Sequence, residues 1–377
     1  MIDVLVIGLG PAGARAAFAA ASRGARVIAM DRKREAGVPV QCAELVPALI
    51  DSGIDLGPCV RQRIDAMDTF VEGETPDHTA PFPGRMLDRA AFDAALVAEA
   101  VQAGAVCRFG VSVRSVGRDG IVTLSDGARL APRIIVGADG PRSIAGRAIG
   151  QVNRELVETR QLTAPLAAPH AATDIFLSAA IPGGYGWLFP KGDVANLGAG
   201  VAPSHKHLPK EIVDSLHARL VGEGRVGARV LARTGGAIPV GGALVPGGCL
   251  GQVPVLLAGD AAGLANPVTG AGIASAAQSG ALAGEAAALF LDGYASALID
   301  YEDELDALFG AALVRALHRR EELLRSTPTP AALRRGWIAY PQFWGPTLYS
   351  AEQTADVIPR NKESVPGSGR TDELHEA

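Results

Sequence analysis

The N-terminal glycine motif constrains the fold of this chain more than any other feature. A predicted strand from Asp3 to Ile7 leads into Gly8-Leu9-Gly10-Pro11-Ala12-Gly13, and a helical pattern follows from Gly13 to Arg23. A strand, a glycine-rich turn and a helix in this order begin a βαβ unit, in which the glycines allow a tight turn and close approach of a pyrophosphate. The pattern predicts a Rossmann-type dinucleotide site. Its predicted cofactor-binding residues are Gly8, Gly10, Pro11, Ala12 and Gly13.

The next strand ends at a carboxylate that fits the same site. Arg26 to Met30 is the second predicted strand, and Asp31, followed by Arg32, closes it. An acidic residue at this position can accept hydrogen bonds from ribose hydroxyls, so we include Asp31 and its neighbour in the predicted site. The glycine motif and Asp31 fit NAD as well as FAD, and by themselves they leave the dinucleotide open.

A second glycine-rich segment lies far downstream. A buried strand, Val253 to Leu257, leads into Gly259-Asp260-Ala261-Ala262-Gly263, and a helical pattern runs from Gly270 to Leu291. With the N-terminal motif, these residues resemble the FAD-dependent hydroxylase and reductase superfamily, which includes p-hydroxybenzoate hydroxylase and the geranylgeranyl reductases. The resemblance implies that Asp260 binds the ribityl chain, that the helix N-terminus points at the flavin ring, and that the cofactor is FAD. The predicted contacts are Gly259, Asp260, Gly270, Ala271, Gly272 and Ile273.

Two more positions match the same superfamily. Gly137-Ala138-Asp139-Gly140 resembles its middle Asp-Gly motif, and Arg89 resembles an arginine that many members place beside FAD at the start of a helix, here Asp88 to Ala103. Without the resemblance, Asp139 fits an ordinary turn after a strand and Arg89 fits a solvated helix face. Both alternatives stay open.

The segment from Gly184 to Lys191 indicates a branch of the superfamily. Its sequence Gly-Tyr-Gly-Trp-Leu-Phe-Pro-Lys resembles the Tyr-x-Trp-x-Phe-Pro signature of geranylgeranyl reductases. Alternation along a strand places Tyr185, Trp187 and Phe189 on one face, as an aromatic wall beside an apolar ligand or the flavin. We predict these three residues as substrate-binding; the alternative is a face of the sheet core.

Cys42 lies where these reductases also carry a cysteine near the flavin. A thiol there can donate a proton to one carbon while hydride from the flavin reaches the other. We therefore predict Cys42 as catalytic and as a cofactor contact. The alternative is a small buried apolar residue, which is the usual role of a single cysteine.

Composition excludes several classes of function. The chain has 35 basic and 40 acidic residues and a net charge of -5, without the basic stripe that nucleic-acid binding requires. Four cysteines without C-x-x-C spacing argue against a metal site or a disulfide framework. No secretory signal is evident, so we expect a cytoplasmic protein, with peripheral membrane contact left open. Two uncharged stretches, 234–259 and 261–284, contain several glycines and prolines and are interpreted as core, not membrane spans.

The predicted fold class is α/β: a Rossmann-type FAD-binding domain, an interleaved, mostly antiparallel β-sheet substrate domain, and C-terminal helices. We assign residues 1–64, 88–155 and 252–300 to the FAD-binding domain and 65–87 and 156–251 to the substrate domain. A helical region, 301–359, and a flexible tail, 360–377, follow. Aromatic residues crowd 336–349, either as a wall for a long apolar substrate or as packing against the substrate domain.

The resemblance implies an enzyme that reduces carbon–carbon double bonds of an isoprenoid or similar apolar small molecule. The alternative is a flavin monooxygenase, which uses the same FAD scaffold. No second nucleotide-binding domain is evident, so electrons would come from NADPH bound transiently or from a ferredoxin-like partner protein.

Overall fold

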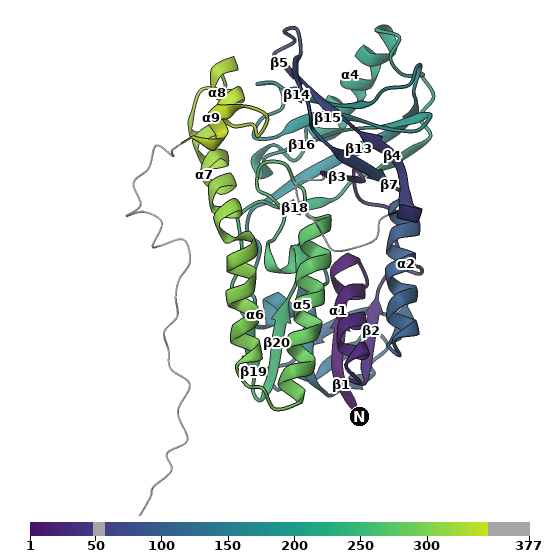
Figure 1. Ribbon diagram of the computed structural model, residues 1–377, viewed down its shortest axis with the longest axis vertical. Helices are drawn as coiled ribbons and strands as arrows, with labels where there is room; N and C mark the ends of the chain where they lie inside the picture. Colours follow the sequence, from purple (N-terminus) through teal and green to yellow (C-terminus); the bar gives the residue numbers. More distant parts are fainter. Residues whose placement is uncertain (48–56, 346–377) are drawn as a thin grey trace, which may run out of the picture. The chain divides into compact units, whose positions relative to one another are not determined.

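The computed structural model describes residues 1–47 and 57–345, and its first layer is a six-stranded sheet in the order β19-β20-β12-β1-β2-β8 (Figure 1). Five of these strands pair in parallel, and β19 joins the edge antiparallel to β20. Parallel strands joined by helices give the βαβ architecture that the N-terminal motif predicts. The strands are β1 (Ile2–Ile7), β2 (Val27–Asp31), β8 (Val106–Phe109), β12 (Pro132–Gly137), β19 (Gly247–Leu250) and β20 (Val253–Leu257).

Helices α1 (Pro11–Ser22) and α5 (Ile273–Leu291) lie side by side against this sheet (Figure 1). Helix α1 begins at proline, which suits the first helical position because its missing N–H has no partner there in any case. The predicted helix start at Gly270 is wrong by three residues. Gly270 has φ +69° and helps to form the turn before the helix, so α5 begins at Ile273. The other helices of this part are α2 (Arg89–Gln102) and α3 (Ile144–Ala148).

The second large sheet has eight strands, paired as β17-β13-β16-β15-β14-β5-β6 with β18 beside β13. The pairing is antiparallel except between β5 and β14, so the predicted mostly antiparallel sheet is confirmed. Helix α4 (Pro209–Gly222) packs on one face. The strands are β5 (Ala66–Val71), β6 (Asp77–Thr79), β13 (Leu156–Pro165), β14 (Ala172–Leu177), β15 (Tyr185–Lys191), β16 (Val194–Val201), β17 (Ala232–Thr234) and β18 (Ala237–Pro239).

Two three-stranded sheets and several short helical turns complete the connections between these layers. One small sheet contains β3 (Leu45–Pro47), β4 (Val60–Ile64) and β7 (Gly84–Leu87); the other contains β9 (Val113–Val116), β10 (Val122–Leu124) and β11 (Arg129–Leu130). The 3-10 turns are Gly57–Cys59, Pro203–His205 and Gly259–Ala262.

The C-terminal helices run alongside both sheets in Figure 1. The helix predicted from Leu298 to Arg325 is present as α6 (Ala297–Leu305) and α7 (Ala311–Arg325), with a π-helical turn, Asp306–Gly310, between them. Helices α8 (Pro330–Arg335) and α9 (Pro341–Trp344) follow. The predicted tail and the end of the predicted helical region, 346–377, lie outside the described residues.

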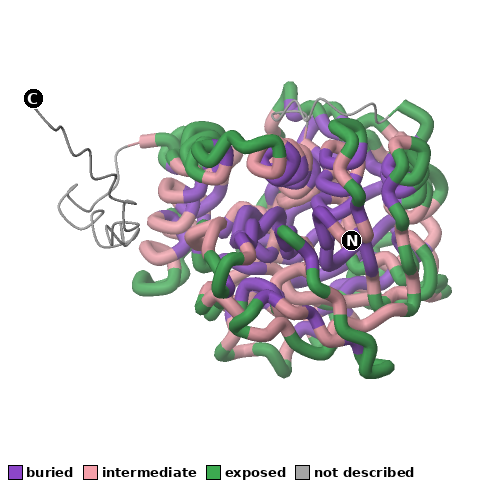
Figure 2. Tube along the Cα trace, turned by 90° about the horizontal axis from the view of Figure 1, so that it is seen from below, coloured by how far each residue is buried: buried purple, intermediate pink, exposed green. Residues whose placement is uncertain are grey.

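The main core lies between the parallel sheet and its helices, with a separate apolar cluster on each face of the second sheet. Figure 2 shows the buried segments gathered inside and the exposed segments around them. Among the described residues, no helix combines the length and the apolar character that a membrane crossing needs.

Candidate functional site

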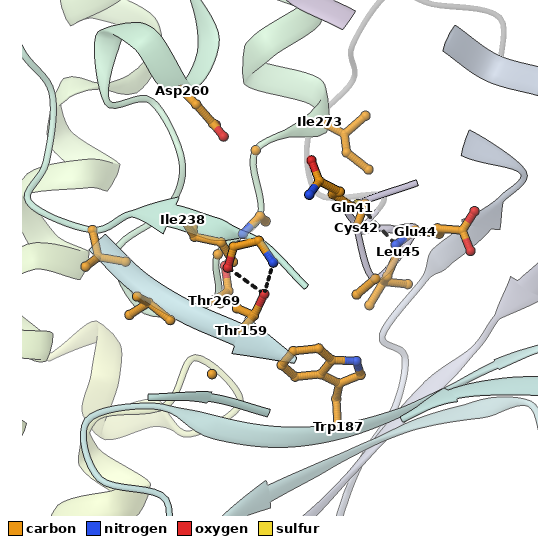
Figure 3. A pocket seen from close by; sticks show the side chains of 18 of the residues that line it. Gln41, Cys42, Glu44, Leu45, Thr159, Trp187, Ile238, Asp260, Thr269 and Ile273 are labelled. Carbon is orange, nitrogen blue, oxygen red and sulfur yellow. Dashed lines mark hydrogen bonds between the residues drawn. The ribbon is translucent and has the colours of Figure 1, made fainter. Parts of the chain in front are cut away.

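A cavity of about 320 Å³ collects residues from every part of the described chain. Its walls come from the turn after β1, the loop before β3, strands β13 and β15, the start of α5, and the C-terminal helices. Figure 3 labels residues of the loop, of both strands and of α5. The predicted site residues that line this cavity are Gly10, Pro11, Ala12, Cys42, Arg89, Tyr185, Trp187, Phe189, Asp260, Gly270, Ala271, Gly272 and Ile273. We refer to this space as the main cavity.

A second, more polar cavity of about 360 Å³ adjoins the main cavity. Cys42, Arg89 and Asp260 line both spaces, while Arg32 and Asp139 line only the second. The more polar second cavity suits the phosphates of a dinucleotide, and the more apolar main cavity suits an apolar substrate beside it. The predicted residues Gly8, Gly13, Asp31 and Gly259 line neither cavity.

The glycine motif fits a bound pyrophosphate. Gly8 has φ +98°, and a Cβ on it would lie 2.2 Å from the carbonyl oxygen of Ala138. A Cβ on Gly13 would lie 1.8 Å from the Gly8 carbonyl oxygen, so both positions require glycine for backbone packing. Gly10 has nothing within 4 Å of the Cβ position and lines the main cavity, where its bare backbone leaves room for a phosphate.

Two helix N-termini, those of α1 and α5, meet at the main cavity. Unpaired N–H groups and the helix dipole make each N-terminus attractive to anionic groups. Asp260 lies on the far side of the cavity from Trp187 (Figure 3). Burial raises the pKa of Asp260 to about 6, against the opposing effect of Arg89. Its carboxylate has no hydrogen-bond partner within the described ranges, and FAD hydroxyls would supply partners.

Two other predicted carboxylates are occupied by neighbouring groups of the chain. Asp31 accepts hydrogen bonds from the backbone N–H groups of Leu9 and Lys33, at 2.9 and 2.8 Å, and so fixes the glycine turn to the end of β2. Asp139 accepts bonds from the Ser143 hydroxyl at 2.5 Å and the Ile144 N–H at 2.6 Å. Burial raises the pKa of Asp139. Both residues therefore shape turns that border the cavities.

Arg89 is buried beside Cys42 at the first turn of α2. Its Nε and Nη2 atoms donate to the two carboxylate oxygens of Asp93 at 3.0 and 3.2 Å. Burial lowers the pKa of Arg89, but Asp93 and Cys42 raise it, and the net shift is upward. The solvated helix face considered from the sequence is therefore wrong for Arg89, whose side chain is only 13% exposed.

The loop that carries Cys42 is fixed to the second sheet. Gln161 donates to the Cys42 carbonyl oxygen at 3.2 Å and accepts the Trp187 indole N–H at 3.1 Å. Buried Glu44, at φ +70°, pairs with Lys191 at 2.7 Å and accepts the Arg89 backbone N–H at 3.0 Å. This network holds the thiol at the junction of the two cavities.

The Cys42 sulfur accepts a hydrogen bond from the Glu44 backbone N–H at 3.2 Å. This bond uses a lone pair of sulfur and therefore does not occupy the S–H donor of the Cys42 side chain. Cys42 lies across the cavity from Ile238 in Figure 3.

Tyr185, Trp187 and Phe189 share one face of β15 and form an aromatic wall of the main cavity. Ring centroids of Tyr185 and Trp187 are 5.7 Å apart, and those of Trp187 and Phe189 are 6.0 Å apart. The Tyr185 hydroxyl donates to the Thr269 carbonyl at 2.5 Å. Trp337 packs on Tyr185, with ring centroids 4.8 Å apart, and also lines the cavity. Both roles considered for the aromatic segment therefore apply to Trp337.

Several residues that complete the main cavity belong to no sequence motif: Thr159, Gln161, Ile238 and Arg320. Thr159 and the backbone of Gly236 exchange hydrogen bonds at 2.9 and 3.1 Å, drawn in Figure 3. These residues lie on strands or a helix with no local motif. Only the fold brings them to the site.

Among the described residues, Asp68, His170 and Asp174 place potential metal-ligand atoms within 4.8 Å of one another, outside both cavities. These side chains already have partners: His78 bonds Asp68 at 2.7 Å, and Asp174 bonds His170 at 2.8 Å and pairs with Arg225.

Fold and site together define a class of protein, the FAD-dependent flavoprotein oxidoreductases. A family described as FAD binding domain matches residues 3–80, and one described as geranylgeranyl reductase catalytic domain matches residues 158–238. Digeranylgeranylglycerophospholipid reductase 2 of Methanopyrus kandleri is 33% identical over 350 residues, which cover 84% of this chain and 85% of the relative. This chain belongs to the geranylgeranyl reductase family.

Solved structures agree on the fold. A geranylgeranyl bacteriochlorophyll reductase-like protein from Thermoplasma acidophilum matches with a TM-score of 0.78 and 24% identity, covering 96% of each chain. A probable FAD-dependent monooxygenase from Pseudomonas aeruginosa matches with a TM-score of 0.65 and 20% identity over 88% of this chain and 98% of that one. A protein described as reductase-like and one described as a probable monooxygenase therefore share this fold, and the fold by itself does not distinguish the two activities.

Proposed function

We propose that this protein reduces carbon–carbon double bonds in the geranylgeranyl chains of an isoprenoid glycerophospholipid. The observation that carries the proposal is the 33% identity, over 85% of its length, to a reductase named for that substrate. The main cavity supports it, because an aromatic wall without charge suits an unsaturated hydrocarbon chain.

Bound FAD, when reduced, supplies a hydride from its N5 atom. The chain holds that group with the glycine motif Gly8 to Gly13, with Asp260, and with the N-terminus of α5. Arg32 and Arg89 border the second cavity and favour the phosphate end of the cofactor. With these assignments, the FAD-binding part comprises residues 1–64, 88–155 and 252–300. The substrate part comprises residues 65–87 and 156–251.

Cys42 donates the proton that completes the reduction. A hydride added to one carbon of a double bond leaves the other carbon in need of a proton, and the thiol lies at the cavity wall with its position fixed by Gln161 and Glu44. Tyr185, Trp187 and Phe189 orient the chain and exclude water from the reacting carbons. A nicotinamide or a ferredoxin-like protein reduces the flavin.

Anaerobic turnover tests this function against the monooxygenase alternative. The FAD-loaded protein is reduced with dithionite and mixed with digeranylgeranylglyceryl phosphate, and the product is analysed by mass spectrometry. We expect a gain of two hydrogens per double bond and reoxidation of the flavin without oxygen. Turnover that requires oxygen, with an oxygen atom inserted into the product, would establish the monooxygenase.

A further inference from the structure

Arg320 is a buried cation in an otherwise largely apolar part of the main cavity. It lies on α7, is 7% exposed, and lines the cavity together with the turn before β15. Its Nη1 atom donates to the Gly183 carbonyl oxygen at 2.8 Å. The Nη2 atom is buried and has no hydrogen-bond partner within the described part of the chain. A guanidinium whose donors are left unmet at a cavity wall is costly to the folded protein unless a ligand completes them.

The other charged side chains of the main cavity already have assignments. Glu44 is saturated by Lys191, by Asn196 and by a backbone N–H. Arg89 is held in a bidentate pair with Asp93, and we assign Asp260 to FAD. Among the described charged side chains that line this cavity, Arg320 is therefore the one with neither a paired carboxylate nor an assigned contact to the cofactor.

The charge of Arg320 is poorly compensated within the protein. Burial lowers the pKa of its guanidinium, and the only opposing effect is that of the exposed Glu155, which forms no ion pair with it in the described structure. Arginine nevertheless stays protonated. An anion at Nη2 would offset the desolvation of the guanidinium, and its planar donors match phosphate oxygens in a two-point contact.

We infer that Arg320 binds the phosphate group of the isoprenoid substrate and so fixes which end of the chain enters the main cavity. The inference rests on the proposed function and names a residue that selects phosphate-bearing isoprenoids over uncharged ones. A geranylgeranyl chain is hydrocarbon throughout, so the phosphate is the group that can satisfy a buried guanidinium. The shared chemistry is a phosphate ester, carried either by a prenyl phosphate or by a prenylated glycerol phosphate.

Ligand binding to the FAD-loaded, oxidised protein tests the inference without turnover. Three probes are titrated and followed by quenching of tryptophan fluorescence, since Trp187 and Trp337 line the cavity: geranylgeranyl phosphate, digeranylgeranylglyceryl phosphate and uncharged geranylgeraniol. We expect the wild-type protein to bind the tighter of the two phosphates with about 10- to 100-fold higher affinity than the alcohol. This is the gain in affinity expected from a hydrogen bond to a charged group. The phosphate that binds more tightly shows which of the two molecules carries the phosphate ester that the protein recognises.

Variants of the same helix separate anchoring from folding. Arg320→Met should lose the preference for phosphate and keep its affinity for geranylgeraniol, whereas Arg320→Lys should retain part of the preference because it keeps the charge. Arg325→Met, which removes an exposed arginine of α7, should behave as wild type. FAD content and its absorbance spectrum should be the same in all four proteins.

The outcomes distinguish failure of the anchor from failure of the proposed function. If Arg320→Met keeps the phosphate preference, or weakens all three probes equally, Arg320 has a structural role and the anchor is wrong, while the reductase proposal stands. If the wild-type protein binds the alcohol as tightly as both phosphates, the anchor is also wrong. If the wild-type protein binds none of the probes, both inferences fall.

Discussion

At Cys42, the structure supports a proton donor whose loss leaves the cofactor in place. The Cys42→Ala variant should retain FAD, because the residues assigned to the pyrophosphate and ribityl chain lie elsewhere. Removing a positioned general acid typically slows turnover by about 100- to 10,000-fold. The measurement is anaerobic reoxidation of the reduced flavin by the isoprenoid substrate, with FAD content determined by absorbance after denaturation.

Cys249→Ala is the matched control for Cys42→Ala, since Cys249 is exposed and lies outside both cavities. It should leave the turnover rate unchanged. Wild-type turnover in Cys42→Ala would show that the cysteine is a packing residue of the loop, and water would then be the better candidate for the acid.

Asp260 should make the stability of the FAD-free protein depend on pH. Burial raises its pKa from 3.8 to about 6, so between these values the folded state binds more proton than the unfolded state, and the free energy of unfolding falls as pH rises. A shift of roughly two units corresponds to about 3 kcal/mol, lost progressively as the pH rises from about 3 to about 7. Urea unfolding of the wild-type and Asp260→Asn apoproteins at about pH 4 and about pH 7.5 measures most of this contribution.

The comparison of these two proteins isolates Asp260 from the other titrating groups. Asp260→Asn should be less sensitive to pH over this interval and should bind FAD more weakly, because an amide replaces a carboxylate acceptor. Equal pH dependence in the two apoproteins would mean that Asp260 keeps an ordinary pKa in the empty cavity.

The residues that sequence motifs placed in the site and those that they missed differ in a physical way. Gly10 and Asp260 act through local backbone geometry at strand ends, so the signal lies in adjacent residues. Arg320 and Gln161 reach the cavity only because α7 and β13 pack there, and a single arginine or glutamine in a periodic segment carries no local signal. For Asp31, the sequence identified the position but could not reveal that Leu9 and Lys33 already use its carboxylate.

At the level of elements, the contact between α1 and α5 depends on two glycines in α5. A Cβ on Gly280 would lie 2.0 Å from the Ala12 carbonyl oxygen, and one on Gly284 would lie 2.2 Å from that of Ala16. Gly280→Ala should force the helices apart and destabilise the protein by about 1–3 kcal/mol. Since Ala12 belongs to the glycine motif, the variant should also retain less FAD, measured as bound flavin per chain after purification.

Gly222→Ala provides the control for Gly280→Ala. Gly222 ends α4, has ordinary φ, and has nothing within 4 Å of its Cβ position, so alanine there should be neutral or stabilise by up to about 1 kcal/mol. If Gly280→Ala matches this control in melting temperature and in FAD content, the two helices adjust without cost and the tight packing has no role in holding the cofactor.

Elements with a strong local pattern were predictable, and irregular ones were not. The apolar run Val253 to Leu257 is β20 with the same bounds, because a continuous apolar segment ended by glycine suits a buried parallel strand. The π-helical turn at 306–310 has no sequence signal of its own, because apolar residues at helical spacing continue on both sides of it. The parallel pairing of β5 with β14 joins segments about 100 residues apart, and alternation within either strand does not specify that partner.

At the scale of the whole molecule, one wall of the main cavity comes from a part of the chain that the sequence marked only by its aromatic enrichment. Trp337 follows α8, is 3% exposed, and contacts Tyr185 on β15 and the Met67 sulfur on β5. Arg334 and Tyr340 on either side bond Asp77 at the end of the second sheet, at 3.0 and 2.7 Å. The C-terminal helices therefore form a wall of the main cavity.

Trp337→Ala should consequently impair substrate binding more than cofactor binding. Loss of a buried indole costs about 3–5 kcal/mol of stability and enlarges the cavity beside Tyr185, so KM for the isoprenoid should rise by about 10-fold or more. Bound FAD should stay at one per chain, because Trp337 is not among the residues assigned to FAD. Trp344→Ala is the control, since Trp344 is 58% exposed; KM should stay at the wild-type value. Loss of FAD from Trp337→Ala at a temperature where the protein remains folded would contradict this separation and would mean that the C-terminal helices support the flavin itself.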